Sequence, residues 1–335
     1  MAFLLTLLAC TPEAVDPPVP TDETGLSHTG EPAPVEVVDM ATYLQACERE
    51  LGPLPAFSCA DAVEVPITVT DASGTRVVTA LDQLEDGFRC DRSSIGGCAP
   101  YTRIGATTNA RGSNLVFGCR NYGADPAFDQ INAIFTSPTT GATCFFSTRH
   151  RDEVYGDGAN LPRPGSDADL AFSELPFWYT LDDLRQSACV ECHDNDAILH
   201  NPWVRQVDVL PVGGPLAPYW RVAEGVLADG GSPFWATPSR DLIHPATAPC
   251  RQCHRLSERH SCVLAKEATG REPRGLTTEW FRTSYPENRW MSTFDHDELL
   301  AAWPTEAAWE AAWGEAADAI DACCSADPPA GCFAP

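Results

Sequence analysis

The sequence predicts an α+β protein with a small, disulfide-tied, β-rich N-terminal half and an irregular helical C-terminal half. Three observations lead to this class. Apolar and β-branched runs typical of strands lie at residues 63–70, 75–80, 115–119 and 143–148. Ten cysteines outside any short motif form an even set, as a disulfide framework requires. Patterns with one apolar helical face occur at residues 40–51 and 304–324.

The N-terminal half, residues 39–151, is expected to begin with a helix over residues 40–51. Leu44, Cys47 and Leu51 are spaced to share one face of that helix. The runs at 63–70 and 75–80 are separated by Asp-Ala-Ser-Gly, which predicts a hairpin with a four-residue loop. The later runs add strands to a small sheet, and no catalytic constellation occurs in this half.

The C-terminal half, residues 152–335, carries the helix signals. Thr180 and Asp183 have the spacing of a capping box, which predicts a helix running toward Cys189. Pro304 suits the first turn of a last helix. The apolar stripe of that helix is expected to be core, and it consists of Trp309, Trp313, Ala316, Ile320 and Cys323.

Two copies of the pentapeptide Cys-x-x-Cys-His, at residues 189–193 and 250–254, are the most informative motifs. Two thiols at this spacing reach the two vinyl groups on one edge of a porphyrin, while the adjacent imidazole ligates the iron. These segments resemble the attachment sites of c-type cytochromes. The resemblance covers the two pentapeptides and their surroundings and implies two covalently bound c-type haems. The resemblance implies that the thioether anchors are Cys189, Cys192, Cys250 and Cys253. It implies that the proximal iron ligands are His193 and His254.

The second axial ligand of each iron decides between electron transfer and catalysis, because a closed sixth position leaves only electron transfer. The resemblance does not supply these distal ligands. The candidates are His200, His260, His244 and Met291, with His150 and His296 as further histidines. The short distance between His193 and His254 predicts that both haems share one domain and lie near each other.

The first ten residues, MAFLLTLLAC, resemble a bacterial lipoprotein signal with Cys10 as the lipidated residue. This implies export to the cell envelope and a lipid anchor in the outer membrane, facing the periplasm or the surface. Residues 11–38 are rich in proline and acidic residues and have no lysine or arginine, which predicts a disordered tether. A zinc site is the alternative reading of the Cys-x-x-Cys pairs, and the exported compartment argues against it.

In an oxidising compartment the ten cysteines outside the motifs are expected to form five disulfides. Cys47 with Cys59 is a guess from proximity in the sequence. Adjacent Cys323 and Cys324 are poorly placed to bridge each other. We expect them to pair separately, with Cys332 and Cys262 as the candidates.

A formal charge of −25 argues against nucleic-acid binding, which needs a positive face. It favours a cationic partner steered by long-range attraction. The leading hypothesis is an exported dihaem c-type cytochrome that carries electrons between a membrane system and an extracytoplasmic redox protein, with no catalytic residue of its own. The alternatives are an enzyme similar to the dihaem peroxidases, and a surface binding module in which haem only stabilises the fold.

Overall fold

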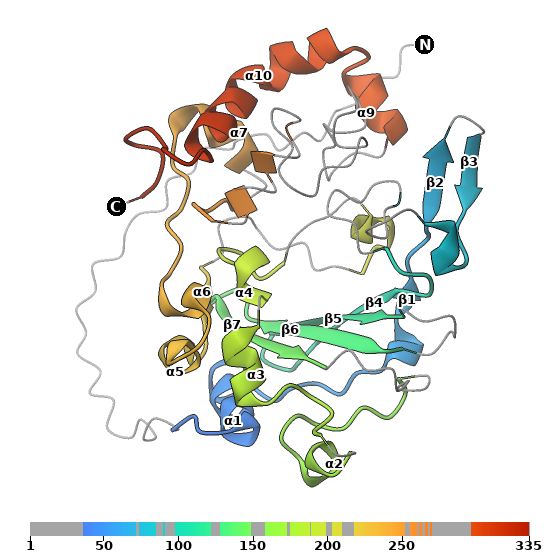
Figure 1. Ribbon diagram of the computed structural model, residues 1–335, viewed down its shortest axis with the longest axis vertical. Coiled ribbons are helices and arrows are strands. Elements are labelled where there is room, and N and C mark those ends of the chain that lie inside the picture. Colours follow the sequence, from blue (N-terminus) through green and yellow to red (C-terminus); the bar gives the residue numbers. More distant parts are fainter. Residues whose placement is uncertain are drawn as a thin grey trace. The chain divides into compact units, whose positions relative to one another are not determined.

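The computed structural model shows a mixed fold with a β-rich N-terminal half and helices in the C-terminal part (Figure 1). It describes residues 36–71, 74–84, 90, 98–121, 128–148, 158–172, 175–187, 189–198, 203–209, 218–251, 255–259, 261–262, 265–266, 269 and 296–334. Val37–Pro335 form one compact unit, distinct from Met1–Glu36. The expected signal, Cys10 and nearly all of the tether lie outside the described residues.

A six-stranded sheet forms the centre of the N-terminal half (Figure 1). Its strands, in spatial order, are β1 (Val63–Glu64), β4 (Arg103–Thr108), β5 (Asn114–Arg120), β6 (Gln130–Thr136), β7 (Ala142–Ser147) and β8 (Trp220–Arg221). All neighbours are antiparallel except β7 and β8. The strands expected near residues 115–119 and 143–148 are confirmed. Because β8 comes from beyond residue 151, residues of both halves share this sheet.

The predicted hairpin forms with a shorter loop than expected. Strand β2 (Thr68–Asp71) pairs with β3 (Gly74–Val77), and Asp71 lies opposite Gly74. Only two residues therefore separate the strands, and the four-residue loop was wrong. Gly74 has φ +116°, a conformation open to glycine, so the ladder can extend to this position. Val63–Glu64 is not part of the hairpin and pairs instead with β4.

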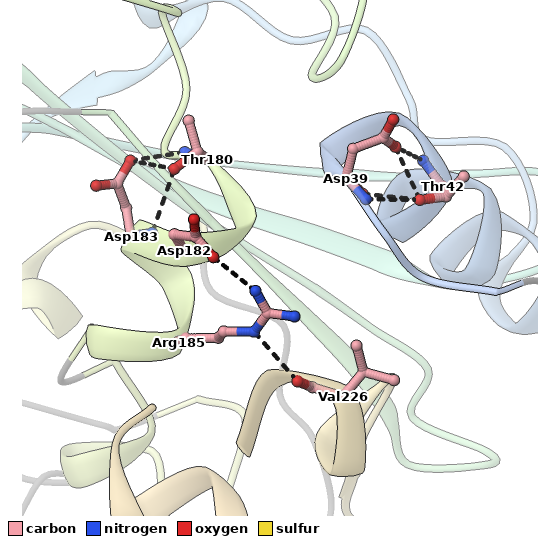
Figure 2. A network of polar contacts seen from close by, with 7 residues as sticks. All are labelled: Asp39, Thr42, Thr180, Asp182, Asp183, Arg185 and Val226. Atoms are coloured by element: carbon pink, nitrogen blue, oxygen red, sulfur yellow. Dashed lines mark hydrogen bonds and ion pairs between the residues drawn. The ribbon is translucent and has the colours of Figure 1, made fainter. Parts of the chain in front are cut away.

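Helix α1 (Met40–Leu51) confirms the expected helix and its buried face. Asp39 and Thr42 form a capping box at its start, shown in Figure 2. Leu44, Cys47 and Leu51 are all buried. The Cys47–Cys144 disulfide attaches this face of the helix to β7.

The ten cysteines other than Cys10 and the four motif cysteines all form disulfides, as the sequence predicts. The pairs are Cys47–Cys144, Cys59–Cys119, Cys90–Cys98, Cys262–Cys324 and Cys323–Cys332. The separate partners expected for Cys323 and Cys324 are confirmed. The guess of Cys47 with Cys59 was wrong, because Cys47 on α1 faces β7 while Cys59 begins the short 3-10 helix η1 (Cys59–Asp61), which is tied to β5.

The C-terminal part consists of short helices and one long helix. The described helices are α2 (Asp167–Leu170), α3 (Leu181–Gln186), α4 (Cys189–Cys192), α5 (Glu224–Ala228), α6 (Pro233–Ala236), α7 (Ala248–Arg251), α9 (His296–Ala302) and α10 (Glu306–Cys323). This part also contains the 3-10 turns η3 (Val204–Gln206) and η4 (Pro245–Thr247), whereas η2 (Leu81–Gln83) lies in the N-terminal half. Helix α10 packs against η4 and α7 (Figure 1).

Helix α10 begins later than expected, because Thr305 is its N-cap and accepts a hydrogen bond from the backbone N–H of Ala308. Pro304 therefore precedes the cap and does not enter the first turn. Trp309 and Ile320 are buried, which agrees with an apolar stripe in the core. No described helix is long and apolar enough to cross a bilayer.

Candidate haem-attachment site

Helix α3 leads to the first motif and is fixed at both ends. The Thr180–Asp183 capping box is present, as expected (Figure 2). Arg185 pairs with Asp182 at 2.6 Å, and its Nε donates to the backbone oxygen of Val226 in α5. The expected helix running toward Cys189 is present; it ends at Gln186, with a break before α4. The break follows from the extended backbone of the C-cap residue Ser187, at ψ 143°.

The first motif forms its own single turn, α4. The backbone N–H of His193 donates to the carbonyl of Cys189 at 3.1 Å, so these residues lie one helical turn apart on the same side. Cys189 forms no disulfide with any described cysteine. Burial raises the pKa of its thiol, and a hydrogen bond with Ser187 opposes this shift. The side chain of Cys192 lies outside the described residues.

The surroundings of His193 keep its imidazole uncharged. Among the described residues, its buried Nδ1 has no hydrogen-bond partner. Burial lowers the pKa of His193 to about 4, so the ring is uncharged at neutral pH, which is the form that ligates a metal. Backbone groups of Ala197 and Asp196 oppose this decrease in the pKa, and the cation of Arg120 adds to it.

An aromatic side chain packs against this imidazole, and a second packs behind it. The ring centroids of His193 and Phe145 are 5.7 Å apart, and Phe145 meets Trp235 edge-on at 5.9 Å. The buried indole Nε1 of Trp235 likewise has no hydrogen-bond partner among the residues whose positions are described. The hydroxyl of Tyr219 donates to the backbone oxygen of His193. The first motif is therefore set against an apolar wall built from β7 and α6.

The second motif lies in a loop that is closed at its base. Residues 240–242 run antiparallel to residues 256–258, with a bridge between Asp241 and Ser257. The backbone N–H of Leu242 donates to the oxygen of Leu256 at 2.9 Å. Between these ends the chain forms η4 and α7, and Cys250 lies within α7. Cys253 and His254 lie outside the described residues.

The C-terminal segment joins this loop base. The backbone N–H of Ile243 donates to the oxygen of Cys332 at 2.8 Å, and Leu242 bridges Phe333. The Cys262–Cys324 and Cys323–Cys332 disulfides connect the same region to α10. Leu242, the described cysteines 262, 323, 324 and 332, and Ile320 form one buried cluster around it.

Hydrogen bonds connect the residues after the first motif to the base of the second loop. The Asn195 amide donates to a carboxylate oxygen of Asp241 and to the backbone oxygen of Leu256, the latter at 3.3 Å. Asp194 accepts from the hydroxyl of Ser257 and, at 3.3 Å, from the backbone N–H of Ser261. We call these six residues the junction.

Oppositely charged side chains attract each other across the junction. Arg259 and Arg255, which follow the second motif, attract the carboxylates of Asp194 and Asp196 respectively. Burial raises the pKa of both carboxyls, and these cations oppose the increase. The surroundings of the two motifs therefore complement each other in charge as well as in hydrogen bonding.

The candidate distal ligands are only partly covered by the structure. His244 is the N-cap of η4, where its Nδ1 accepts a hydrogen bond from the backbone N–H of Ala246. His296 begins α9, and its side chain is not described. His150, His200, His260 and Met291 lie outside the described residues. The proposed distal coordination therefore stays a prediction.

Sequence reasoning missed the junction and the wall beside His193. The run Asp194-Asn195-Asp196 has the composition of a solvated turn, and only its position directly after a motif could have singled it out. Among the residues that the structure describes, no cluster of three or more His, Cys, Asp or Glu side chains is suited to a metal ion. The chain matches no protein-family model, and neither a curated protein nor a solved structure is significantly similar to it.

Proposed function

We propose that this protein is an exported dihaem c-type cytochrome that carries electrons between a membrane system and an extracytoplasmic redox partner. The observation that carries the proposal is the state of the first motif. Cys189 stays outside the five disulfides, although ten other cysteines are paired. One turn away, the buried Nδ1 of His193 has no hydrogen-bond partner in the part of the chain that the structure describes.

These residues suit a covalently attached haem. A buried nitrogen without a hydrogen bond is costly, and ligation or a partner supplied with the bound group removes that cost. The wall of Phe145 and Trp235 offers aromatic surface of the kind that packs against a porphyrin. Cys189, Cys192 and His193 would hold one haem, and Cys250, Cys253 and His254 the other. When bound, each haem supplies an iron that alternates between the ferrous and ferric states.

The surrounding residues would set how easily the haem is reduced. A buried apolar wall lowers the local dielectric, and nearby carboxylates such as Asp194 and Asp196 favour the more positive iron. Tyr219 fixes the backbone of His193 from outside the motif. Arg120 contributes a positive charge near the imidazole.

The disulfides support the exported location, because such bonds persist in oxidising compartments. Lipidation of Cys10 would anchor the protein to the outer membrane, facing the periplasm or surface, with residues 11–38 as the tether. A charge of −25 would attract a cationic redox partner and give an association rate that falls with added salt.

Paired cysteine variants test haem attachment at each motif. The Cys189→Ala/Cys192→Ala and Cys250→Ala/Cys253→Ala variants, produced in a host that attaches c-type haem, should each keep one haem of two in a pyridine haemochrome assay. The Cys90→Ala/Cys98→Ala variant removes a short-range disulfide outside both motifs and should keep both haems. Equal haem content in all three variants would contradict the proposal.

Ligand addition to the wild-type protein separates electron transfer from catalysis. Iron closed by two axial ligands should give a low-spin spectrum that cyanide leaves unchanged, with reversible reduction and no peroxide turnover. A high-spin ferric signal that shifts with cyanide, together with peroxide turnover, would identify a peroxidase. Failure to exchange electrons with any donor would leave haem with a structural role only.

A further inference from the structure

We propose that the junction positions the two attachment segments relative to each other, so that the two haems behave as one coupled pair. This inference rests on the proposed function, since it concerns the spacing of the haems that the motifs would bind. It adds a role for residues outside both pentapeptides, namely Asp194 and Asn195 on one side and Asp241, Leu256, Ser257 and Ser261 on the other.

The geometry of Asn195 carries the first step. Its amide group has two N–H donors, and the structure directs them to two different chain segments at the base of the second loop. One acceptor is the Asp241 side chain before the motif, and the other is the Leu256 backbone after it. A single side chain therefore fixes both ends of the loop that contains the second motif.

Asp194 adds a second attachment, to residues after the motif. It accepts from the Ser257 hydroxyl and the Ser261 backbone, and Ser257 and Ser261 contact each other through their hydroxyls at 3.0 Å. Three hydrogen-bond contacts thus converge on two neighbouring serines. The arrangement resists rotation of one segment against the other, which a single contact would allow.

Burial makes most of the junction a selective contact, because only the Asp241 side chain is substantially exposed, at 45%. Asp194 is 1% exposed, Asn195 6% and Ser257 0%. Water cannot readily replace a hydrogen bond at such a site, so separation of the segments leaves buried polar groups without partners. The charges of Arg255 and Arg259 favour the same pairing.

The junction also lies close to both motifs along the chain. Asp194 and Asn195 follow His193 directly, while Leu256 and Ser257 follow His254 after a single residue, Arg255. Such short connections leave little freedom for the motifs to move independently of the junction. In an electron carrier, a fixed spacing allows one haem to pass its electron to the other repeatedly with the same efficiency.

The test uses two variants with matched controls. Asn195→Ala removes the contact with both ends of the loop, and Ser257→Ala removes the hydroxyl that Asp194 accepts. The control Asn109→Ala removes an amide that donates to two backbone oxygens, of Leu51 and Pro53, both at 2.9 Å. The control Ser113→Ala removes a buried hydroxyl that donates to the Leu51 oxygen at 2.7 Å. Both control residues lie between β4 and β5 and bond to the end of α1, away from the junction.

The first readout is the circular dichroism of the Soret band in protein loaded with two haems. Two porphyrins held close together at a fixed angle give a two-signed band, so we expect this band in the wild type and its loss in the two junction variants. Both control variants should keep it. A two-signed band that survives in the junction variants, is lost equally in the controls, or is missing from the wild type would overturn the inference.

The second readout is hydrogen exchange, which needs no haem. Asn195→Ala and Ser257→Ala should speed exchange about tenfold or more in residues 193–198 and in residues 255–262 together. The controls should leave both segments unchanged. Exchange that rises in only one segment, or in neither, would overturn the inference. A protein without haem would refute the proposed function, while this exchange result would still decide the role of the junction.

Discussion

Two disulfides in the C-terminal region share adjacent cysteines but close chain segments of very different length. Cys262–Cys324 spans a sequence separation of 62 and Cys323–Cys332 a separation of 9. A cross-link restricts the unfolded chain more strongly when the closed loop is longer. Removal of each bond by paired alanine substitution is therefore expected to have different costs.

The loop-closure relation gives the magnitudes. A loop of the length closed by Cys262–Cys324 corresponds to about 4 kcal/mol of unfolding free energy, and the shorter loop to about 2.5 kcal/mol. Each disulfide closes a loop whose length is the same whether or not the other disulfide is present. The two free-energy values can therefore be compared directly. The Cys262→Ala/Cys324→Ala variant should lose about 1.5 kcal/mol more than the Cys323→Ala/Cys332→Ala variant.

Denaturant unfolding, followed by tryptophan fluorescence, measures both losses. Trp309 and Trp313 on α10 report on the region that the disulfides hold. Both pairs lie in one buried cluster, so the local packing loss is similar and the difference isolates loop length. Equal losses, or a larger loss for the shorter loop, would refute this reasoning.

Two further substitutions test local features of the fold. Asp39→Ala should cost about 1 kcal/mol at neutral pH by removing the cap of α1. Hydrogen bonds from Thr42 lower the pKa of Asp39 from its ordinary value of 3.8, so this contribution is present above that value and fades as the pH falls through the lowered pKa. Urea unfolding at neutral and strongly acidic pH should show the difference disappear in acid, and an unchanged difference would contradict it. Gly231→Ala would place a Cβ atom 2.5 Å from the backbone oxygen of Arg185, at a cost of about 1–3 kcal/mol in thermal unfolding. Gly225→Ala meets no atom within 4 Å and should cost nothing; similar losses at both glycines would argue against a close contact with α3.

Local rules predicted the elements whose signals are complete within a short segment. The apolar face of α1, the Thr180–Asp183 capping box and the separate partners of Cys323 and Cys324 are all of this kind. Each depends on spacing along one segment or on the geometry of adjacent residues. Long-range disulfide partners such as Cys47 with Cys144 depend on tertiary structure, and the sequence could not supply them.

Strand β4 shows why part of the sheet was missed. Gly105 interrupts its apolar pattern and is typical of a break in a strand. In the structure Gly105 pairs with Phe117, and a Cβ atom at this glycine would lie 2.2 Å from the Phe117 ring. The ring of Phe117 on the neighbouring strand leaves no room for a side chain at residue 105. A rule based on local sequence cannot detect this requirement.

The sequence identified the first motif, but it did not identify the residues that pack against the motif or bond to its flanks. Cys189 and His193 belong to a recognisable pentapeptide. Phe145, Trp235 and Asn195 have no such pattern, and they contact the motif or its flanks only because distant segments fold together.

The most direct test of covalent haem attachment is mass spectrometry of protein matured in a host that attaches c-type haem. Trypsin releases the first motif whole, within residues 186–205, but cuts the second after Arg251 and so separates Cys250 from Cys253. We predict that the first peptide carries one added tetrapyrrole and that peptides 241–251 and 252–255 stay joined through another. Separate peptides with unmodified cysteines and no added tetrapyrrole would contradict the proposed function.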